Sequence, residues 1–240
     1  MKEKYELSLN KIEANMLNHF KNIVKDRAIS PTETQEFFNN FCEWILRQNG
    51  INSAKYKINF IVDKPLDHYA DVDRVGKTGF NVSVDRTWAL ATGAFSYAFT
   101  MLLGAHETQH IVQSIKQPSL EFDLAREKKA IAALADKYAN RKNTKKLSKL
   151  VVRLAKSNEY LHPAEQDADE KAYDYVEQLM NRMIVLTRDE QLIEYFRLAI
   201  ESVEEVRTSE ERARKNVQRE YGKDVKVAKR LGVIDFGFNV

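Results

Sequence analysis

Two histidines, His106 and His110, stand four residues apart in this 240-residue chain, with Glu107 directly after the first. They lie in an otherwise apolar run over residues 102–112, which predicts a buried helix. Residues four apart on a helix lie nearly above one another, so both imidazoles face one point and the carboxylate lies beside it. Two neutral imidazoles suit Zn²⁺, and a neighbouring carboxylate can take a proton from zinc-bound water. Chance also produces this spacing among five histidines, but histidines on a solvated helix face would have polar neighbours.

A zinc site built on two helical histidines needs at least one more protein ligand and an open position for water. The sequence offers Glu165 and Asp169, in a helix that Pro163 opens. Glu165 falls in the first turn, where the helix dipole favours its ionised form, and Asp169 follows one turn later on the same face. Acidic residues are common in any first helical turn. Together with the histidine helix, however, they predict a third ligand and a second carboxylate placed behind one histidine.

The elements that must position these side chains are mostly helical. Helical spacing of apolar residues predicts a helix over about residues 5–27. A second helix begins at Ser30, whose capping box with Glu33 marks the N-terminus. Alternating residues then predict strands over 55–62 and 79–85, joined by a polar loop.

The histidine helix is predicted to start near Gly93 and to end before Pro118. Two charged helices are predicted over about 120–156, another helix begins at Pro163, and helical structure is predicted to continue to about Tyr221. A second capping signal, formed by Thr208 and Glu211, predicts a break in its last stretch.

The polar loop contains Gly76-Lys77-Thr78, which resembles the end of a phosphate-binding loop. That motif also needs a glycine where this chain has Asp71, and a helix where a strand is predicted to follow. We therefore predict no nucleotide site there.

Composition restricts the class of protein. The net charge of +3 is small against 38 basic and 35 acidic residues, so it indicates no nucleic-acid partner. Cys42, the single cysteine, stands in an apolar run and is expected to be a buried, inert thiol. No apolar run is long enough to span a bilayer, and the N-terminus lacks a signal-peptide core. We therefore expect a cytoplasmic protein without a transmembrane segment.

Two motifs, His-Glu-x-x-His at 106–110 and Glu-x-x-Ala-Asp at 165–169, together resemble those of the gluzincin zinc metallopeptidases. The order of strands and loop before them is similar to that of the compact minigluzincins. The resemblance implies an α+β, mainly helical fold, with a small antiparallel or mixed sheet packed on the active-site helix and a glutamate helix. It covers a metallopeptidase core at 55–183, which leaves an N-terminal helical segment at 1–54 and a C-terminal helical extension at 184–240.

The resemblance also implies roles for the motif residues. His106, His110 and Glu165 would bind Zn²⁺. Glu107 would be the general base, and Asp169 would orient His106.

Substrate binding is implied in the same way. The second strand, at Asn81, Val82 and Ser83, would be the edge that pairs with an extended peptide. His162 and Tyr160 are both candidates for stabilising the oxyanion, and the sequence does not choose between them.

We therefore expect a zinc-dependent endopeptidase that hydrolyses peptide bonds of a protein or peptide substrate through a zinc-bound water activated by Glu107. The alternative is a non-catalytic regulatory or binding module of the same fold. Glu107 favours the enzyme, because a site without catalytic activity does not need a general base. One departure from the family is Gln109, where glycine usually precedes the second histidine and permits close packing.

Two further segments have more than one interpretation. The basic amphipathic helix over 141–156 either packs its apolar stripe on the core or contacts anionic lipid or nucleic acid. The apolar tail from Val233 to Val240 either caps the helical core or lies near the cleft as an extended, inhibitory strand.

Overall fold

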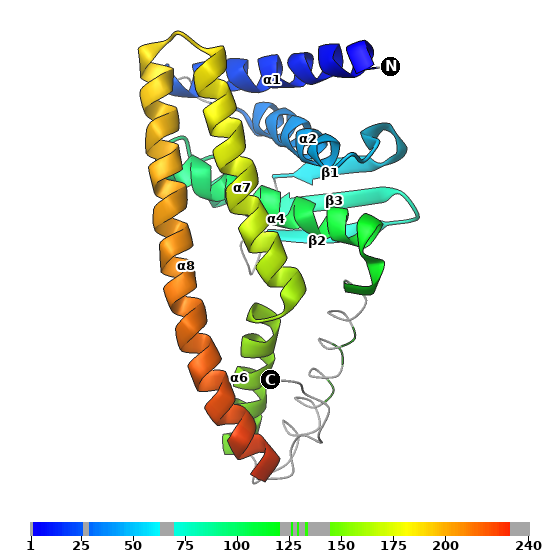
Figure 1. The fold of residues 1–240 in the computed structure, drawn as a ribbon, viewed down its shortest axis with the longest axis vertical. Coiled ribbons are helices and arrows are strands. Elements are labelled where there is room, and N and C mark those ends of the chain that lie inside the picture. Colours follow the sequence, from blue (N-terminus) through cyan, green and yellow to red (C-terminus); the bar gives the residue numbers. More distant parts are fainter. Residues whose placement is uncertain are drawn as a thin grey trace. The chain divides into compact units, whose positions relative to one another are not determined.

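The computed structural model describes residues 2–25, 29–62, 70–120, 126, 129, 133 and 145–230. It confirms a mainly helical α+β fold with a small mixed sheet (Figure 1). The helices are α1 (Lys2–Val24), α2 (Pro31–Gln48), the 3₁₀ turn η1 (Ser53–Lys55), α3 (Arg86–Ala89), α4 (Ala94–Lys116), α6 (Lys145–Tyr160), α7 (Pro163–Leu186) and α8 (Glu190–Arg230). The strands are β1 (Lys57–Ile61), β2 (Ala70–Val75) and β3 (Gly79–Val84).

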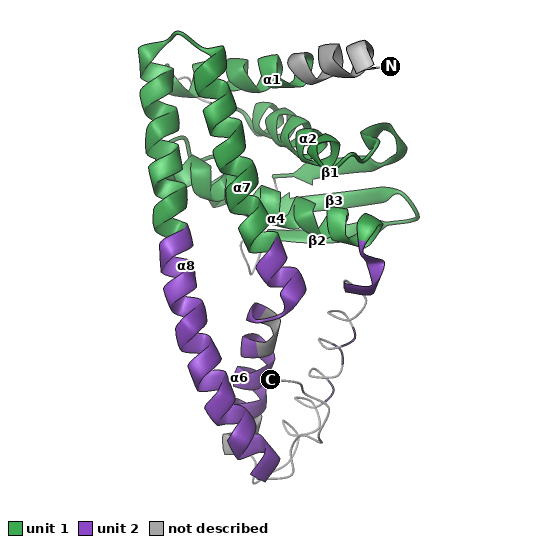
Figure 2. Cartoon of the chain, in the orientation of Figure 1, with its two compact units in different colours: residues 1–116, 168–206 green, residues 117–167, 207–240 purple. Residues whose placement is uncertain are grey.

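The chain divides into two compact units (Figure 2). Unit 1 comprises Met1–Lys116 and Ala168–Val206, and unit 2 comprises Gln117–Asp167 and Arg207–Val240. Two of the divisions fall inside α7 and α8, which are continuous helices. The segment boundaries after residues 54 and 183 were inferred from the resemblance, and they stay predictions.

Unit 1 is built around the sheet, whose strand order is β1-β3-β2. β1 runs parallel to β3, and β2 runs antiparallel to it. α2 contacts β1, while α4 contacts both β2 and β3. Alternate residues of β3 (Phe80, Val82 and Val84) are buried, as expected for the strand face that packs against helices.

Capping residues set the start of α2 as the sequence predicted. The Ser30 hydroxyl accepts the Glu33 backbone N–H at 3.2 Å, and the Glu33 carboxylate accepts the Ser30 N–H at 3.0 Å. Two N–H groups at the helix start are thereby satisfied. After the helix, Gly50 takes a φ of 68°, a conformation that favours glycine.

Aromatic side chains form the centre of the unit 1 core. The rings of Phe38 on α2 and Phe60 on β1 stack with centroids 4.3 Å apart. Gly104 on α4 lies directly against both rings. A Cβ at this position would lie 3.1 Å from the Phe38 ring. A larger residue would have to displace a fully buried ring, so Gly104 allows α4 to approach α2 closely.

The prediction of a polar loop between the two expected strands was wrong, because β2 lies there. Three of its six residues are charged, including Arg74, and these obscured the alternation of a strand. Arg74 pairs with Phe80 on β3 and places its guanidinium 5.9 Å from the centroid of that ring. Gly76-Lys77-Thr78 forms the turn between β2 and β3, where Gly76 has a φ of 68°, so a hairpin occupies the place of the apparent phosphate-binding motif.

The predicted break at Thr208 was also wrong, because α8 continues through it for 41 residues. A capping signal is local, and the strong helix formers around Thr208 override it. The chain instead breaks between α7 and α8, where the Asp189 side chain accepts the backbone N–H groups of Gln191 at 3.0 Å and Leu192 at 3.3 Å.

In unit 2, the apolar stripe of α6 packs against α8. Leu150, Val151 and Leu154 are buried with Tyr221 and Val225. This agrees with the interpretation in which the stripe joins a core, for the part of the basic helix that the structure describes.

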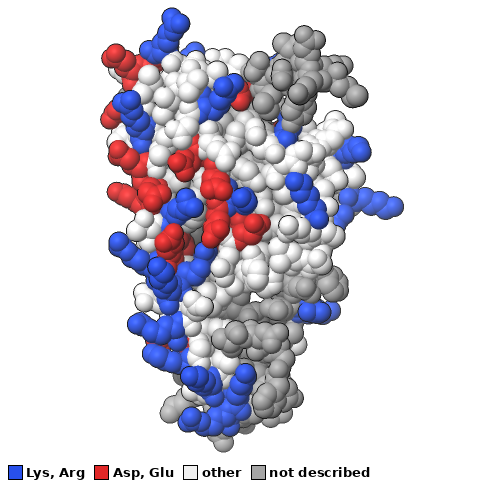
Figure 3. All heavy atoms as spheres, in the orientation of Figure 1, with Lys and Arg blue, Asp and Glu red and all other residues white. Residues whose placement is uncertain are grey.

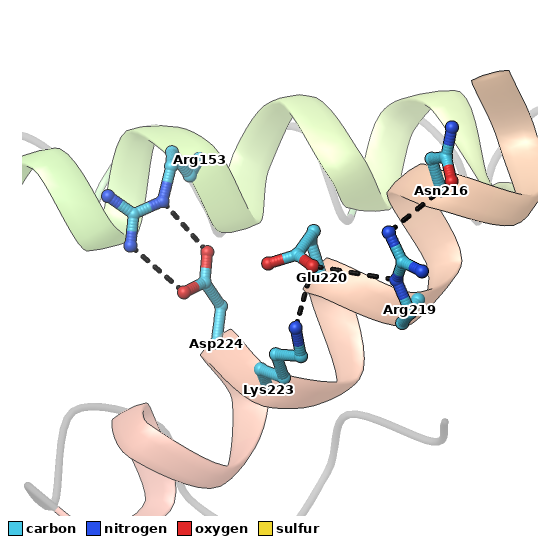
Figure 4. Close-up of polar contacts among 6 residues, drawn as sticks. All are labelled: Arg153, Asn216, Arg219, Glu220, Lys223 and Asp224. Atoms are coloured by element: carbon cyan, nitrogen blue, oxygen red, sulfur yellow. Dashed lines mark hydrogen bonds and ion pairs between the residues drawn. The ribbon is translucent and has the colours of Figure 1, made fainter.

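An ion pair on the surface of unit 2 also joins α6 to α8. Both donors of Arg153 lie 2.9 Å from the Asp224 carboxylate (Figure 4). The bidentate pair raises the pKa of Arg153 above its ordinary value, mainly through the hydrogen bonds to Asp224.

Parts of several predictions lie outside the described residues: most of the charged helix from 120 to about 140, the start of the basic helix at 141–144, the tail from 233 and the loop over 63–69. Among the helices that the structure describes, none is both long enough and apolar enough to cross a bilayer.

Candidate metal centre

α4 brings its two histidines together on one side. The Nε2 atoms of His106 and His110 lie 3.1 Å apart, and the ring planes meet at 79°. His106 is partly exposed and His110 is 8% exposed, so the pair lies at the boundary between core and surface. The bounds of α4, Ala94–Lys116, agree with the helix that the sequence predicted.

Each ring has an acceptor at its other nitrogen. Nδ1 of His106 lies 2.7 Å from Oδ1 of Asp169, on α7. Nδ1 of His110 lies 2.9 Å from Oε1 of Gln113, one turn further along α4. Acceptors at these positions favour the tautomer in which each neutral ring carries its proton on Nδ1 and its lone pair on Nε2.

Both Nε2 lone pairs are therefore directed into the same small space. At 3.1 Å they repel one another unless a cation or a proton lies between them. Tetrahedral Zn²⁺, with Zn–N distances of about 2.0–2.1 Å, would place two such nitrogens about 3.3 Å apart. The observed separation is close to that value, so the pair fits two ligands of one metal ion.

Glu165 supplies the third candidate ligand. One ligand atom from each of His106, His110 and Glu165 lies within 4.8 Å of the other two. Glu165 stands in the first turn of α7, four residues before Asp169, so the continuous helix presents both carboxylates on one side. Two imidazoles and one carboxylate form a ligand set used by catalytic zinc sites.

The sequence analysis missed Gln113. Its side chain is 1% exposed, and its carbonyl oxygen is the acceptor that orients His110. The signal was present, because Gln113 is a polar residue in an apolar run, three positions after His110 on the same helix.

Gln109, the departure from the family pattern, has its own buried partner. Its carbonyl oxygen accepts the Tyr175 hydroxyl proton at 3.0 Å, and the Tyr175 oxygen accepts a hydrogen bond from Asn49 at 2.7 Å. This chain of contacts joins α4 to α7 and to the end of α2. The space beside His110 is therefore filled by a hydrogen-bonded side chain rather than by close backbone packing.

Glu107, the predicted general base, is half-buried on α4. The next residue, Thr108, is fully buried, and its hydroxyl donates to the Gly104 carbonyl at 2.6 Å. The same hydroxyl lies 3.1 Å from Sγ of Cys42. Burial raises the pKa of the Cys42 thiol to about 12, so it is not ionised at neutral pH and cannot act as a nucleophile.

The two candidates for oxyanion stabilisation have different surroundings within unit 2. The Tyr160 hydroxyl donates to the Glu210 carboxylate on α8, and the Arg214 guanidinium lies 5.4 Å from the centroid of its ring. Nδ1 of His162 accepts the backbone N–H of Ala164 at 3.1 Å, which leaves the proton of the neutral ring on Nε2. His162 therefore has an N–H to donate, whereas the Tyr160 proton is already directed at a carboxylate.

The strand predicted to pair with an extended peptide is not an edge, and that prediction was wrong. β3, which contains Asn81, Val82 and Ser83, is the central strand and is paired on both sides. Its hydrogen-bonding groups are therefore used within the sheet. The error follows from the missed β2, because without that strand β3 was expected to be the last one.

Comparisons with protein-family models, with curated proteins and with solved structures found no match to this chain. The arguments for its function therefore depend on the geometry of its own residues.

Proposed function

We propose that this chain is a zinc-dependent peptidase with a gluzincin-like site. One observation carries the proposal: two Nε2 atoms on α4 lie 3.1 Å apart while acceptors hold both Nδ1 atoms. With both ring protons on Nδ1, the two Nε2 lone pairs face each other, and this arrangement needs a positive charge between them as its reason. A metal ion gives such a reason, and the Glu165 carboxylate nearby completes a three-residue ligand set.

His106, His110 and Glu165 would hold the metal. Bound zinc would supply a Lewis acid that polarises a carbonyl and makes a water molecule acidic near neutral pH. Glu107 follows His106 on the helix, about 100° round from it, so its carboxylate can accept the proton of the attacking water and return it to the leaving amine. Asp169 holds Nδ1–H of His106 and thereby keeps Nε2 available as a ligand.

β2 is the strand that we propose for peptide pairing. The sheet has two edges among the described residues, β1 and β2. On β1 the Phe60 backbone N–H donates to the Asn39 side chain of α2 at 2.9 Å, so α2 occupies part of that edge. β2 forms the opposite edge and contacts α4, the helix with the histidines. An extended peptide added there would gain backbone hydrogen bonds, which give affinity with little demand on sequence.

Elemental analysis of the purified protein tests the proposal. We expect about one zinc per chain. His106→Ala removes one of three ligands and should abolish stoichiometric zinc. His19→Gln is a matched control, because His19 is a buried histidine of α1 that hydrogen-bonds to Tyr97 instead. Retention of zinc by the His106 variant, or loss of it from the control variant alone, would contradict the assigned ligands.

A further inference from the structure

α8 is one continuous helix, and its periodicity places a row of exposed charged residues on one face. At about 100° per residue, seven of its side chains lie within about 20° of a single line along the helix. All seven are exposed. They are Glu194, Glu201, Glu205, Arg212, Arg219, Lys223 and Arg230. We call them the α8 face, and because α8 is one continuous helix of 41 residues their alignment follows from its periodicity.

The charges of the α8 face are separated by sign. Its acidic residues all precede Arg212, and no acidic residue of the α8 face follows it. Figure 3 shows acidic side chains gathered on one part of the visible surface and basic side chains on another. Exposed neighbours at its edges extend the pattern, with Glu190 in the first half and Lys215 and Lys226 in the second. Arg197, also at an edge, is the exception.

The basic residues in the second half of the α8 face stay exposed to solvent although two of them form ion pairs within the helix. The Glu220 carboxylate lies beside the face, 2.8 Å from the Lys223 ammonium and 3.6 Å from the Arg219 guanidinium (Figure 4). The side chains of Lys223 and Arg219 nevertheless remain 64% and 68% exposed. Both bases can therefore reach a partner.

The apolar residues of α8 fit the same pattern. Leu198 and Val227 are its exposed large hydrophobic residues, at 46% and 43%. Twenty-nine residues separate them, about eight helical turns, so both lie on the same border of the α8 face. They are also nearly equidistant from Arg212, one on each side.

We propose that the α8 face docks on the same face of a second copy of this chain, in antiparallel orientation about a two-fold axis at Arg212. In this register Glu194 meets the partner's Arg230. Glu201 meets the partner's Lys223, and Glu205 meets the partner's Arg219. Because the interface is self-complementary, each of these pairs occurs twice.

The same register brings Leu198 against the partner's Val227, on both sides of the axis. The single repulsive contact is between the two copies of Arg212, and guanidinium planes can stack there. α8 is about 60 Å long, which provides room for an interface of standard size, about 800 Å² per partner.

A nucleic acid is the other occupant that the basic half alone would fit. The acidic half lies on the same line of the same helix, and it would repel a polyanion that followed this line. No aromatic side chain belongs to the α8 face to stack on bases. A second copy satisfies both halves at once, and a polyanion satisfies only one.

Sedimentation velocity on the full chain tests the dimer. At up to about 100 µM we expect dimers in about 20 mM salt, and monomers in about 500 mM salt because exposed ion pairs are screened. Glu201→Lys with Glu205→Lys should make the chain monomeric, and so should Arg219→Glu with Lys223→Glu. Either double variant turns four attractive contacts per dimer into repulsive ones, which should weaken association by about 100-fold or more.

Mixing the two double variants gives the decisive result. The substituted residues of one variant then lie opposite acidic residues of the other, so every pair across the interface is attractive again except that between the two copies of Arg212, which is the same as in the parent dimer. We expect a mixed dimer in low salt. Circular dichroism of each variant checks that α8 remains helical.

Glu204→Lys with Glu211→Lys is the matched control, because it makes the same change in net charge about a quarter turn away from the α8 face. It should dimerise like the parent chain. Four results would each overturn the proposal: a monomeric parent chain in low salt, a mixture that stays monomeric, a control as monomeric as the face variants, or a monomer that binds a DNA duplex through Arg219 and Lys223.

Discussion

His106 and Asp169 are 63 residues apart in the sequence, yet Nδ1 of His106 lies 2.7 Å from Oδ1 of Asp169. This contact joins α4 to α7 at the place where α7 also presents Glu165, one turn earlier. The carboxylate that orients His106 therefore also positions the helix that carries Glu165, the proposed third ligand. A zinc site of this kind depends on the contact between the two helices as much as on the ligands themselves.

The two carboxylates of α7 should differ in their effect on zinc affinity. Glu165→Gln removes a charged ligand, so zinc affinity should fall steeply. Asp169→Asn keeps an acceptor near His106, and zinc affinity should fall by only about 10–100-fold, as is typical when an outer partner of a ligand is changed. Zinc titrations with a competing chelator measure both. If the Asp169 variant were the weaker binder, the two roles would be reversed.

Gln113 should affect zinc binding although it is not a ligand. Gln113→Leu removes the acceptor that orients His110, so zinc affinity should fall by about 10–100-fold. Gln113→Glu keeps an acceptor oxygen and should restore affinity to near that of the parent chain.

Gln109→Leu is the matched control for Gln113→Leu. Gln109 is also a buried glutamine of α4, but its carbonyl oxygen accepts from Tyr175. This variant should lose about 1 kcal/mol or more of stability, measured by urea unfolding, and should keep its zinc affinity. Equal zinc affinities in the two leucine variants would argue against a specific role for Gln113.

Glu107 separates an enzyme from a binding module. Glu107→Gln should retain zinc and fold, but it should lose peptide hydrolysis because an amide cannot accept the water proton at neutral pH. Cleavage of a diverse peptide library, with zinc present, measures the effect. If neither the parent chain nor the variant cleaved any peptide, the non-catalytic module would be the better interpretation.

The sequence predicted well where the signal is local. The spacing of His106 and His110, the capping box of Ser30 and Glu33, and the apolar run of α4 each depend on neighbours within one or two helical turns. The structure has those elements where they were expected. The helix that carries Glu165 also begins at Pro163 as predicted.

The errors in the sheet concern features that tertiary contacts decide. β2 has too many charged residues to be recognised alone, and its pairing with β3 is what makes it a strand. That single omission also misplaced the sheet edge at Asn81, Val82 and Ser83. The error at Thr208 has a local cause instead, because the strong helix formers around it continue α8 through the capping signal.

His19 provides a prediction about stability that does not involve zinc. Its ring is 8% exposed and stacks on Phe37 with centroids 4.7 Å apart, and its Nε2 lies 2.7 Å from the Tyr97 hydroxyl. Burial lowers the pKa of His19 to about 4, although the charge of Glu33 acts to raise it. The ring is therefore neutral in the folded protein at neutral pH and accepts the Tyr97 proton.

The sign of the pH dependence follows from that pKa. Below about pH 6.5 the unfolded chain takes up a proton on His19, whereas the folded protein does so only near pH 4. The contribution of His19 to stability is therefore complete above pH 6.5 and is lost as the pH falls towards 4. At pH 5 the loss should be about 2 kcal/mol. Urea unfolding at pH 7.5 and pH 5 measures it.

His19→Gln isolates this contribution, because glutamine offers Tyr97 an acceptor but does not titrate. The variant should be less stable than the parent chain at pH 7.5, since the stacking of His19 on Phe37 is lost. Between pH 7.5 and pH 5 it should lose about 2 kcal/mol less than the parent chain does. Parallel losses in the two proteins would mean that other groups cause the acid sensitivity, and that His19 takes up its proton in the folded protein as readily as in the unfolded chain.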